Sequence, residues 1–271
     1  MIKLLKTSKT YAFAIISAIF TFVPEAVFGK YKLFDKCSDE INIILIRILV
    51  FVAIFILSII VNAIYLKFRR KICIKGHNYS ICIKYGNIFK MSKCKKVIPF
   101  DECYTTSVGN LPCDINPDSI CGQYLSKNPI QDIQTLINNI NLQPAKNKSK
   151  YQNKECYTSG KLVPNGNDLL LAFAKLDKDG LGCLTREEYL DSLSVLWKEI
   201  DKYYGQKDVC IPVLGSGVTR INGTSFSQQE LLDMIICSYR LSANKIKHPY
   251  KLYIICKKRD DFSLNKIGEN L

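Results

Sequence analysis

The sequence has little histidine and no closely spaced pair of cysteines. Its 271 residues include 2 His and 12 Cys, and no two cysteines form a C-x-x-C motif. The eleven cysteines from Cys73 to Cys256 are an odd number, which fits neither a disulfide framework nor a zinc ribbon. We therefore expect reduced cysteines that act as small buried hydrophobic residues in a cytosolic setting, and no metal site.

Common nucleotide-binding and hydrolase motifs are also absent. No G-x-x-x-x-G-K-[ST] occurs, which excludes a P-loop NTPase. The loop 215–220 reads GxGxxR, and the next strand ends in Lys257-Lys258-Arg259 with no acid to hold a ribose diol, so a Rossmann dinucleotide site is not expected. Ser216 lies in L-G-S-G-V, which is not the nucleophile elbow G-x-S-x-G. The sequence offers no complete catalytic constellation.

Positive charge is in excess but is unevenly distributed. The chain has 38 Lys+Arg against 24 Asp+Glu, a formal net charge of +14. The segment 67–75 contains five basic residues and no acid, and these are Lys67, Arg69, Arg70, Lys71 and Lys75. The remaining residues 76–271 carry a net charge of only +6. Because no aromatic–basic repeat typical of RNA-binding modules accompanies this charge, we expect no nucleic-acid partner.

Two apolar segments precede the basic run. Ile43–Leu66 is long enough to cross the hydrocarbon core of a bilayer, which takes about 20 helical residues. The earlier segment Tyr11–Phe28 is interrupted by Pro24 and Glu25, and it suits either a first transmembrane helix or a secretory signal peptide. We favour a membrane region over residues 1–66, a retained hairpin with helices at about 11–28 and 44–66.

The charges around this hairpin predict its orientation. Lysines precede the first apolar segment and the basic run follows the second, while acids offset the lysines of the loop 30–40. The positive-inside rule then places the N-terminus and residues 67–271 in the cytoplasm. The position of the basic run beside a spanning helix favours membrane topology and anionic lipid over nucleic acid as its explanation. Residues 67–71 are expected to be a basic juxtamembrane linker.

Residues 72–271 are expected to form one α/β domain with a mixed, partly parallel sheet. The expected strands are Lys71–Lys75, Ser80–Tyr85, Lys96–Phe100, Asp168–Leu176, Asp208–Leu214 and Lys251–Cys256. The expected helices are Pro129–Ile140, one from the capping box of Thr185 and Glu188 to near Gly205, and one after the capping box of Ser227 and Glu230. The polar segment Asn138–Glu155 is expected to be a long exposed loop.

The strongest site candidate is the glycine loop between a strand and a helix. Gly215 and Gly217 remove side chains where the chain turns, so backbone N–H groups can approach a phosphate closely. Arg220 could add a cationic contact. Ligands of open α/β sheets bind beyond the carboxyl ends of the strands, where this loop is expected. The alternative is an ordinary strand-to-helix turn.

The segment Asp177–Glu188 matches an EF-hand loop in part. Asp177, Asp179, Gly182, Leu184 and Glu188 occupy the expected positions, but Leu181 stands where an oxygen ligand is normally found. The segment before it is typical of a strand rather than of an entering helix. We therefore favour a β-turn followed by a capped helix over a calcium site.

Several segments together resemble a known family. Tyr85-Gly86-Asn87-Ile88-Phe89 resembles the G-D-I-F/T opening of macro domains, and Ile211–Arg220 (IPVLGSGVTR) resembles their P-x-x-G-x-G diphosphate loop. Between them, VIPFDECYTT, SICGQY, LLLAFAKLD and EEYLDSLSVLW resemble a divergent bacterial macro-like domain. With two membrane helices in front, the chain is similar to the membrane effector of type II Thoeris anti-phage defence. The resemblance implies a three-layer macro-like fold over residues 72–271.

The resemblance implies a sensor rather than an enzyme. In that family a TIR-domain partner converts NAD into an ADP-ribose-containing signal, in type II an imidazole adenine dinucleotide of the histidine–ADP-ribose type. The macro domain binds the signal, and homo-oligomers of the effector then disrupt the bacterial inner membrane. No catalytic residue, cofactor or metal is implied.

The resemblance also assigns the ligand-binding residues. They are Asn87, Ile88 and Phe89 at the adenine end, and Gly215, Ser216, Gly217, Val218, Thr219 and Arg220 around the diphosphate. Macro domains usually have Asp where Asn87 stands, and the Asn-rich, multi-glycine loop of hydrolytic macro domains is not recognisable here. The alternatives are a membrane-tethered hydrolase of ADP-ribose derivatives and a membrane-anchored protein with no nucleotide ligand.

Overall fold

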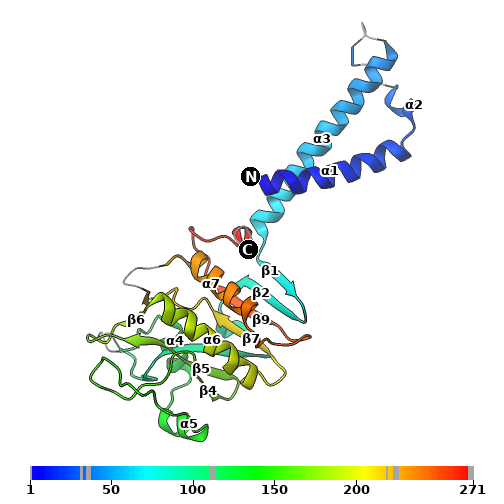
Figure 1. Ribbon diagram of the computed structural model, residues 1–271. Coiled ribbons are helices and arrows are strands. Elements are labelled where there is room, and N and C mark those ends of the chain that lie inside the picture. The colour runs from blue at the N-terminus through cyan, green and yellow to red at the C-terminus, as the bar shows by residue number, and fades with distance from the viewer. Residues whose placement is uncertain are drawn as a thin grey trace. The chain divides into compact units, whose positions relative to one another are not determined.

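The computed structural model describes residues 2–30, 33–34, 38–109, 111, 114–217, 219–221 and 226–267, without the side chains of residues 2–7 and 26. The chain divides into two compact units, Met1–Arg69 and Arg70–Leu271 (Figure 1). We refer to the first unit as the helical hairpin and to the second as the α/β domain.

The helical hairpin consists of two long helices and a short one between them. They are α1 (Ile2–Phe22), α2 (Glu25–Phe28) and α3 (Asp39–Phe68). By length and composition α3 can cross a membrane, since it has 30 residues and a mean hydropathy of 3.2 in its most apolar window. The apolar part of α1, Ser8–Phe22, is shorter. α1 ends before the predicted position because Pro24 cannot continue the helix.

Polar contacts join α1 and α3 within the hairpin. Toward the N-terminus of α1, Asn62 Nδ2 donates to Ser8 Oγ at 2.9 Å, and Ser58 Oγ donates to the Ser8 carbonyl at 3.1 Å. Nearer the other end of α3, Arg47 pairs with Glu25 of α2 at 3.2 Å. Unpaired polar groups are costly in lipid, and these contacts pair polar groups of the hairpin with one another.

The described residues of the α/β domain form a mixed sheet of nine strands. The strands are β1 (Lys71–Gly76), β2 (Tyr79–Tyr85), β3 (Cys94–Asp101), β4 (Leu162–Asn165), β5 (Asp168–Leu176), β6 (Gly182–Leu184), β7 (Asp208–Pro212), β8 (Arg220–Ile221) and β9 (Leu252–Cys256). Their order is β1-β2-β9-β7-β3-β5-β6-β8, and β4 pairs with β5. The run β2-β9-β7-β3-β5 is parallel, whereas β1, β4 and β6 pair antiparallel. The prediction of a mixed, partly parallel sheet is confirmed.

Helices cover both faces of this sheet, which gives three layers (Figure 1). They are α4 (Ile120–Lys127), α5 (Ile133–Asn139), α6 (Arg186–Tyr203) and α7 (Gln228–Leu241), with short 3₁₀ helices at η1 (Ile88–Lys90) and η2 (Leu264–Lys266). Successive residues of a strand point to opposite faces. Leu169 and Leu171 of β5 accordingly pack with α6 and α7, while Leu170 and Ala172 pack with α4 and α5.

Both predicted capping boxes are present. Thr185 and Glu188 cap α6, and Ser227 and Glu230 cap α7, each with the side chain of one residue bonded to the backbone N–H of the other. α6 ends at Tyr203, just before Gly205, which has a φ of +55°. The side chain–backbone bonds satisfy N–H groups that the first helical turn leaves unpaired.

The sequence prediction missed α4 and the short strands β4, β6 and β8, and made α5 too long. α5 begins only after Asp132, whose Oδ1 accepts the Gln134 N–H at 2.9 Å, so Pro129 lies outside it. α4 has only eight residues, too few for a clear helical periodicity.

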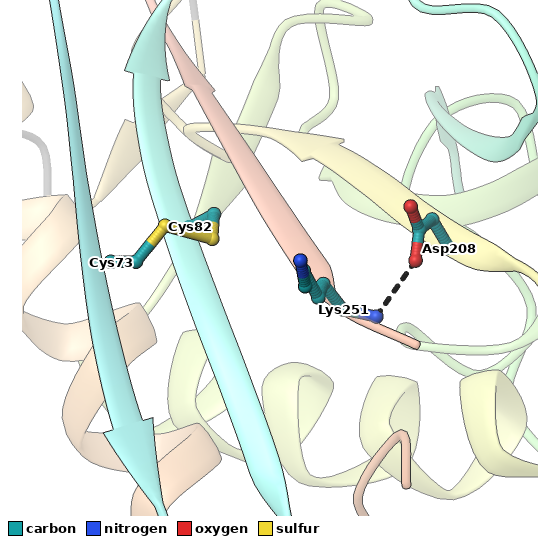
Figure 2. Close-up of a disulfide and its surroundings, with 4 residues drawn as sticks. All are labelled: Cys73, Cys82, Asp208 and Lys251. Atoms are coloured by element: carbon teal, nitrogen blue, oxygen red, sulfur yellow. Dashed lines mark hydrogen bonds between the residues drawn. A yellow bond between two sulfur atoms is a disulfide. The ribbon is translucent and has the colours of Figure 1, made fainter. Parts of the chain in front are cut away.

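The expectation of reduced cysteines is wrong for one pair. Cys73 of β1 and Cys82 of β2 form a disulfide, as Figure 2 shows. They stand directly opposite each other in the antiparallel ladder, with Cα atoms 4.2 Å apart. The two cysteines are nine positions apart in the chain, and the β1–β2 turn brings them together. Other described cysteines are buried as free thiols, namely Cys94, Cys121, Cys156, Cys210 and Cys256.

The predicted loop 138–155 is not wholly exposed. Ser149 is buried, and its Oγ donates to Glu102 Oε1 at 2.6 Å. The same carboxylate oxygen accepts the Leu176 N–H at 3.1 Å. Glu102 therefore connects the ends of β3 and β5 to the long loop, which contradicts a purely solvated segment.

Candidate ligand-binding site

A cavity of about 480 Å³ opens at the carboxyl ends of three parallel strands. Its walls come from the ends of β3, β5 and β7, from segments within 109–121 and 180–182, and from the glycine loop. The apolar part of the lining includes Phe100, Ile115, Ile120, Phe173 and Leu214. This volume and mixed lining are typical of a small-molecule site, and the carboxyl edge is where ligands of α/β sheets bind.

The glycine loop starts with a residue that needs to be glycine. Gly215 has a φ of +78°, a backbone angle that residues other than glycine rarely adopt. A Cβ at this position would also lie 3.3 Å from Ile221 Cδ1, tighter than an ordinary contact. Gly217 differs, because a Cβ there would meet nothing within 4 Å. The loop is therefore closely packed at Gly215 and open at Gly217.

Three side-chain hydrogen bonds hold the glycine loop in place. Buried Tyr189 of α6 donates its hydroxyl to the Leu214 carbonyl at 3.2 Å. Ser216 Oγ donates to the Val213 carbonyl at 2.7 Å, which closes the turn. Arg259, beyond β9, donates to the Ser216 carbonyl at 2.8 Å. The Ser216 N–H also donates to the Val213 carbonyl, at 3.3 Å. A loop fixed in this way can bind a ligand without a large ordering cost.

Two cationic residues line the cavity with the glycine loop. Arg220 lies on β8 and Lys257 directly follows β9. The backbone of Lys257 is held on both sides by buried Gln228, which donates to its carbonyl at 2.8 Å and accepts its N–H at 3.1 Å. Two cations beside a glycine loop favour an anionic ligand such as a diphosphate.

The cavity also contains a buried carboxylate. Asp101 follows the register shift at the end of β3, and its Oδ1 accepts the N–H groups of Cys103 at 2.9 Å and Thr105 at 3.0 Å. Burial raises the pKa of Asp101, while these hydrogen bonds act in the opposite direction. A second acid in the lining, Asp114, accepts the Leu111 N–H at 3.2 Å.

The structure separates the two predicted groups of site residues. Gly215, Ser216, Gly217, Thr219 and Arg220 all line the cavity, and Val218 lies outside the described residues.

The segment 87–89 is not part of the cavity lining. Asn87 Oδ1 accepts the Phe89 N–H at 2.8 Å and so begins η1. Ile88 is buried against Cys94 and Ile255, and the Phe89 ring lies 4.9 Å from Lys127 Nζ.

Sequence reasoning missed Asp101 and Lys257 as cavity residues. Asp101 was quoted only within the family-resembling segment 97–106, and Lys257 only as one of three basic residues at a strand end. The available signal for both residues was their position at the carboxyl end of a strand, where ligands of such sheets bind. Using it requires the order of the strands, which the sequence does not state.

The EF-hand-like segment forms a hairpin turn and a capped helix. Asp177 Oδ1 accepts the N–H groups of Asp179 and Leu181, each at 2.9 Å. Glu188 caps α6 and pairs with Lys175 at 2.7 Å. These contacts use the two carboxylates that a calcium site would need at its first and last positions.

Comparison with known proteins gives one family. The family described as "Thoeris protein ThsA, Macro domain" matches residues 81–257. The Thoeris protein ThsA of Bacillus amyloliquefaciens (strain Y2) is 30% identical over 270 residues, covering 96% of this chain and 88% of that protein.

Solved macrodomains are similar at low identity. The Oceanobacillus iheyensis macrodomain with ADP has a TM-score of 0.46 and 9% identity, covering 70% of this chain and 89% of its own. The macrodomain of Thermus aquaticus DarG has a TM-score of 0.39 and 12% identity, covering 66% and 98%. These structures are too dissimilar in sequence to assign residues of this chain by position.

Proposed function

The chain belongs to the Thoeris ThsA macro-domain family of anti-phage defence, and we propose that its α/β domain binds an ADP-ribose-containing signal in the cavity. The observation that carries this proposal is the glycine loop. It is fixed by Tyr189 and Arg259, open at Gly217, and accompanied by Arg220 and Lys257. The diphosphate would lie over Gly217, with its negative charge close to both cations.

The signal and the response follow from the family resemblance. We propose that a TIR-domain partner makes the signal from NAD, as an imidazole adenine dinucleotide of the histidine–ADP-ribose type. Binding would promote self-association of the effector, and the helical hairpin would then disrupt the bilayer. An apolar α3 able to cross a membrane supports this response.

We propose a location in the bacterial inner membrane, with the N-terminus and the α/β domain in the cytoplasm. The basic segment 67–75 after α3 supports this orientation. The Cys73–Cys82 disulfide weighs against it, because disulfides are rare in the cytosol. The positive charges act on membrane insertion directly, and the proposed orientation follows them.

The redox state of this pair in cells tests the orientation. Cells would be quenched with a membrane-permeant alkylating agent, and the peptides containing Cys73 and Cys82 would be analysed by mass spectrometry. A cytoplasmic domain should give mainly alkylated cysteines. A fully oxidised pair would place the domain outside the cytoplasm.

Ligand binding is tested by a pair of substitutions at one position. The full chain in detergent would be titrated with ADP-ribose by calorimetry. The unsubstituted protein and its variants Gly217→Gln and Gly217→Glu would be compared. The two side chains have similar volume, but only glutamate adds a negative charge where the diphosphate is expected. We expect Gly217→Glu to weaken binding at least about tenfold more than Gly217→Gln, corresponding to about 1.4 kcal/mol. Equal effects, or no binding by the unsubstituted protein, would contradict the proposal.

Hydrolysis of the ligand is the second candidate function, and Asp101 is the observation that favours it. A buried carboxyl with a raised pKa in a ligand cavity is a candidate acid or base. Its Oδ1 already accepts two backbone N–H groups, which points to a structural use. Chromatography of ADP-ribose after long incubation decides between them, since loss of ligand that Asp101→Asn abolishes would establish an enzyme.

A further inference from the structure

One face of the sheet carries three lysines and a tyrosine. Lys71 of β1 stands directly opposite Lys84 of β2, and Lys75 of β1 stands opposite Ser80. Tyr253 of β9 pairs with Cys82 and so lies on the same face. We call Lys71, Lys75, Lys84 and Tyr253 the basic sheet face. The disulfide in Figure 2 joins two strands of this face.

The opposite face of the same strands fixes the orientation of these lysines. Ile81 and Ile83 of β2 are fully buried in the large core, and Ile72 and Ile74 of β1 pack against it. A shift of one residue in register would move these isoleucines into solvent and the lysines into the core. The basic sheet face is therefore a fixed feature of the domain.

Among the described residues of the α/β domain, the lysines of this face form no ion pair. Lys71 and Lys84 are like charges in directly opposed positions, which is unfavourable in a ladder. Both ammonium groups lie over the Tyr253 ring, at 5.5 and 5.8 Å from its centroid. The ion pairs found in the described part of the α/β domain involve other lysines. The nearby carboxylate of Asp208 accepts the Lys251 N–H at 2.9 Å (Figure 2).

We propose that the basic sheet face binds the headgroups of anionic phospholipids in the membrane that anchors the chain. Only Arg69 and Arg70 separate the end of α3 from the start of β1. Such a short extended link reaches about 10 Å, so the face begins close to the headgroups. Lysines held near an anionic leaflet are attracted to it. This inference rests on the proposed crossing of the membrane by α3, but not on nucleotide binding.

Protection of an edge strand does not account for the arrangement. Lysines on an edge discourage pairing with another chain, and Lys71 and Lys75 of β1 could serve that purpose. Lys84 lies on β2, which is paired on both sides, with β1 and β9. A lysine on an inner strand, placed against another lysine, is explained by an anionic ligand on the shared face.

The single Trp197 provides a probe of membrane docking. The full chain would be placed in nanodiscs containing a dansyl-labelled lipid, and energy transfer from Trp197 to dansyl would be measured. We expect more transfer in discs with phosphatidylglycerol than in discs of phosphatidylcholine alone. The excess should vanish at 1 M salt, where the Debye length is about 3 Å. Equal transfer in both kinds of disc would overturn the proposal.

Matched variants locate the effect on the basic sheet face. The variant Lys71→Gln/Lys75→Gln/Lys84→Gln should remove the excess energy transfer. Each lost lysine should lower the equilibrium constant for docking roughly fivefold. Replacing the same lysines with Arg should preserve it. The control changes three lysines elsewhere, Lys178→Gln/Lys198→Gln/Lys202→Gln, and should leave it unchanged. Equal loss in both glutamine variants would overturn the proposal. Failure of the membrane anchor would show separately, as protein that does not co-elute with the discs.

Discussion

Leucine side chains are exposed on the long helix of the helical hairpin but buried in the core of the α/β domain. In α3, Leu49 and Leu57 are 54% and 60% exposed, whereas Leu169, Leu170 and Leu171 of β5 are 0% exposed. Burial of the strand residues is driven by water. The α3 residues have no such burial within the described part of the hairpin, and the helix is long and apolar enough to cross a bilayer. If α3 spans the membrane as proposed, the stability of the hairpin depends on the bilayer and that of the domain on its core.

The largest effect is expected from removing a core side chain of the domain. Leu170→Ala leaves a cavity between β5 and the helices α4 and α5, and should lower the free energy of unfolding by about 2–5 kcal/mol. Leu57→Ala in α3 is the matched change and should leave the unfolding of the domain unaltered. Urea denaturation of the full chain in detergent, followed by Trp197 fluorescence, measures both. Similar losses in the two variants would contradict the separation into two units.

An added positive charge should be costly in α3 and almost neutral on the surface of the α/β domain. Leu57→Lys places an ammonium in the apolar span of α3 and should cost about 3 kcal/mol of insertion. Leu241→Lys affects a residue that is 88% exposed at the end of α7 and should be almost neutral. The fraction of each variant that resists alkaline extraction from membranes is the measurement. Full retention of the Leu57→Lys protein would show that α3 is not the membrane anchor.

A smaller effect is expected at the polar contact between α1 and α3. Asn62→Leu removes the hydrogen bond to Ser8, and should weaken the helix pair by about 0.6–1.7 kcal/mol. The rings of Phe13 and Phe51 lie 5.5 Å apart, so cysteines at these positions can report the pairing through oxidative cross-linking. Less cross-linked product is expected with Asn62→Leu than with Ile60→Leu, a control at an exposed position of α3. No difference would mean that apolar packing alone holds the pair.

Local patterns predicted the elements of the fold well. The apolar runs gave β5 and α3, and the capping boxes gave the starts of α6 and α7. These elements are encoded by neighbouring residues, which is why a sequence suffices. The burial of Ser149 depends on Glu102, which is distant in the chain, and it was not foreseen. The Cys73–Cys82 disulfide is local but depends on the exact register of the β1–β2 pair, and it was not foreseen either.

The candidate site was only partly predictable for the same reason. The glycine loop is a local feature, since its glycines follow a strand directly. Lys257 joins it because β9 pairs with β7, and Asp101 because β3 pairs with β7 on its other side. Such pairings are set by the packing of the whole domain. The segment 87–89 illustrates the converse, since its local resemblance to a binding motif did not place it in this cavity.

The smallest predicted effect concerns Asp101, an ionisable side chain buried in the α/β domain. Because burial raises the folded-state pKa of Asp101, the ionised form costs stability, and this cost grows as the pH rises from below the unfolded pKa through the folded one. Asp101→Asn keeps an oxygen for the N–H groups of Cys103 and Thr105 but carries no charge. At pH 7 we expect its Tm to exceed that of the unsubstituted protein, because the penalty for the buried charge is removed. The difference should disappear in acid below the ordinary pKa of aspartate, where Asp101 is protonated in both states. A lower Tm for Asp101→Asn at pH 7 would mean that the carboxylate is stabilised by its hydrogen bonds more than it is penalised by burial.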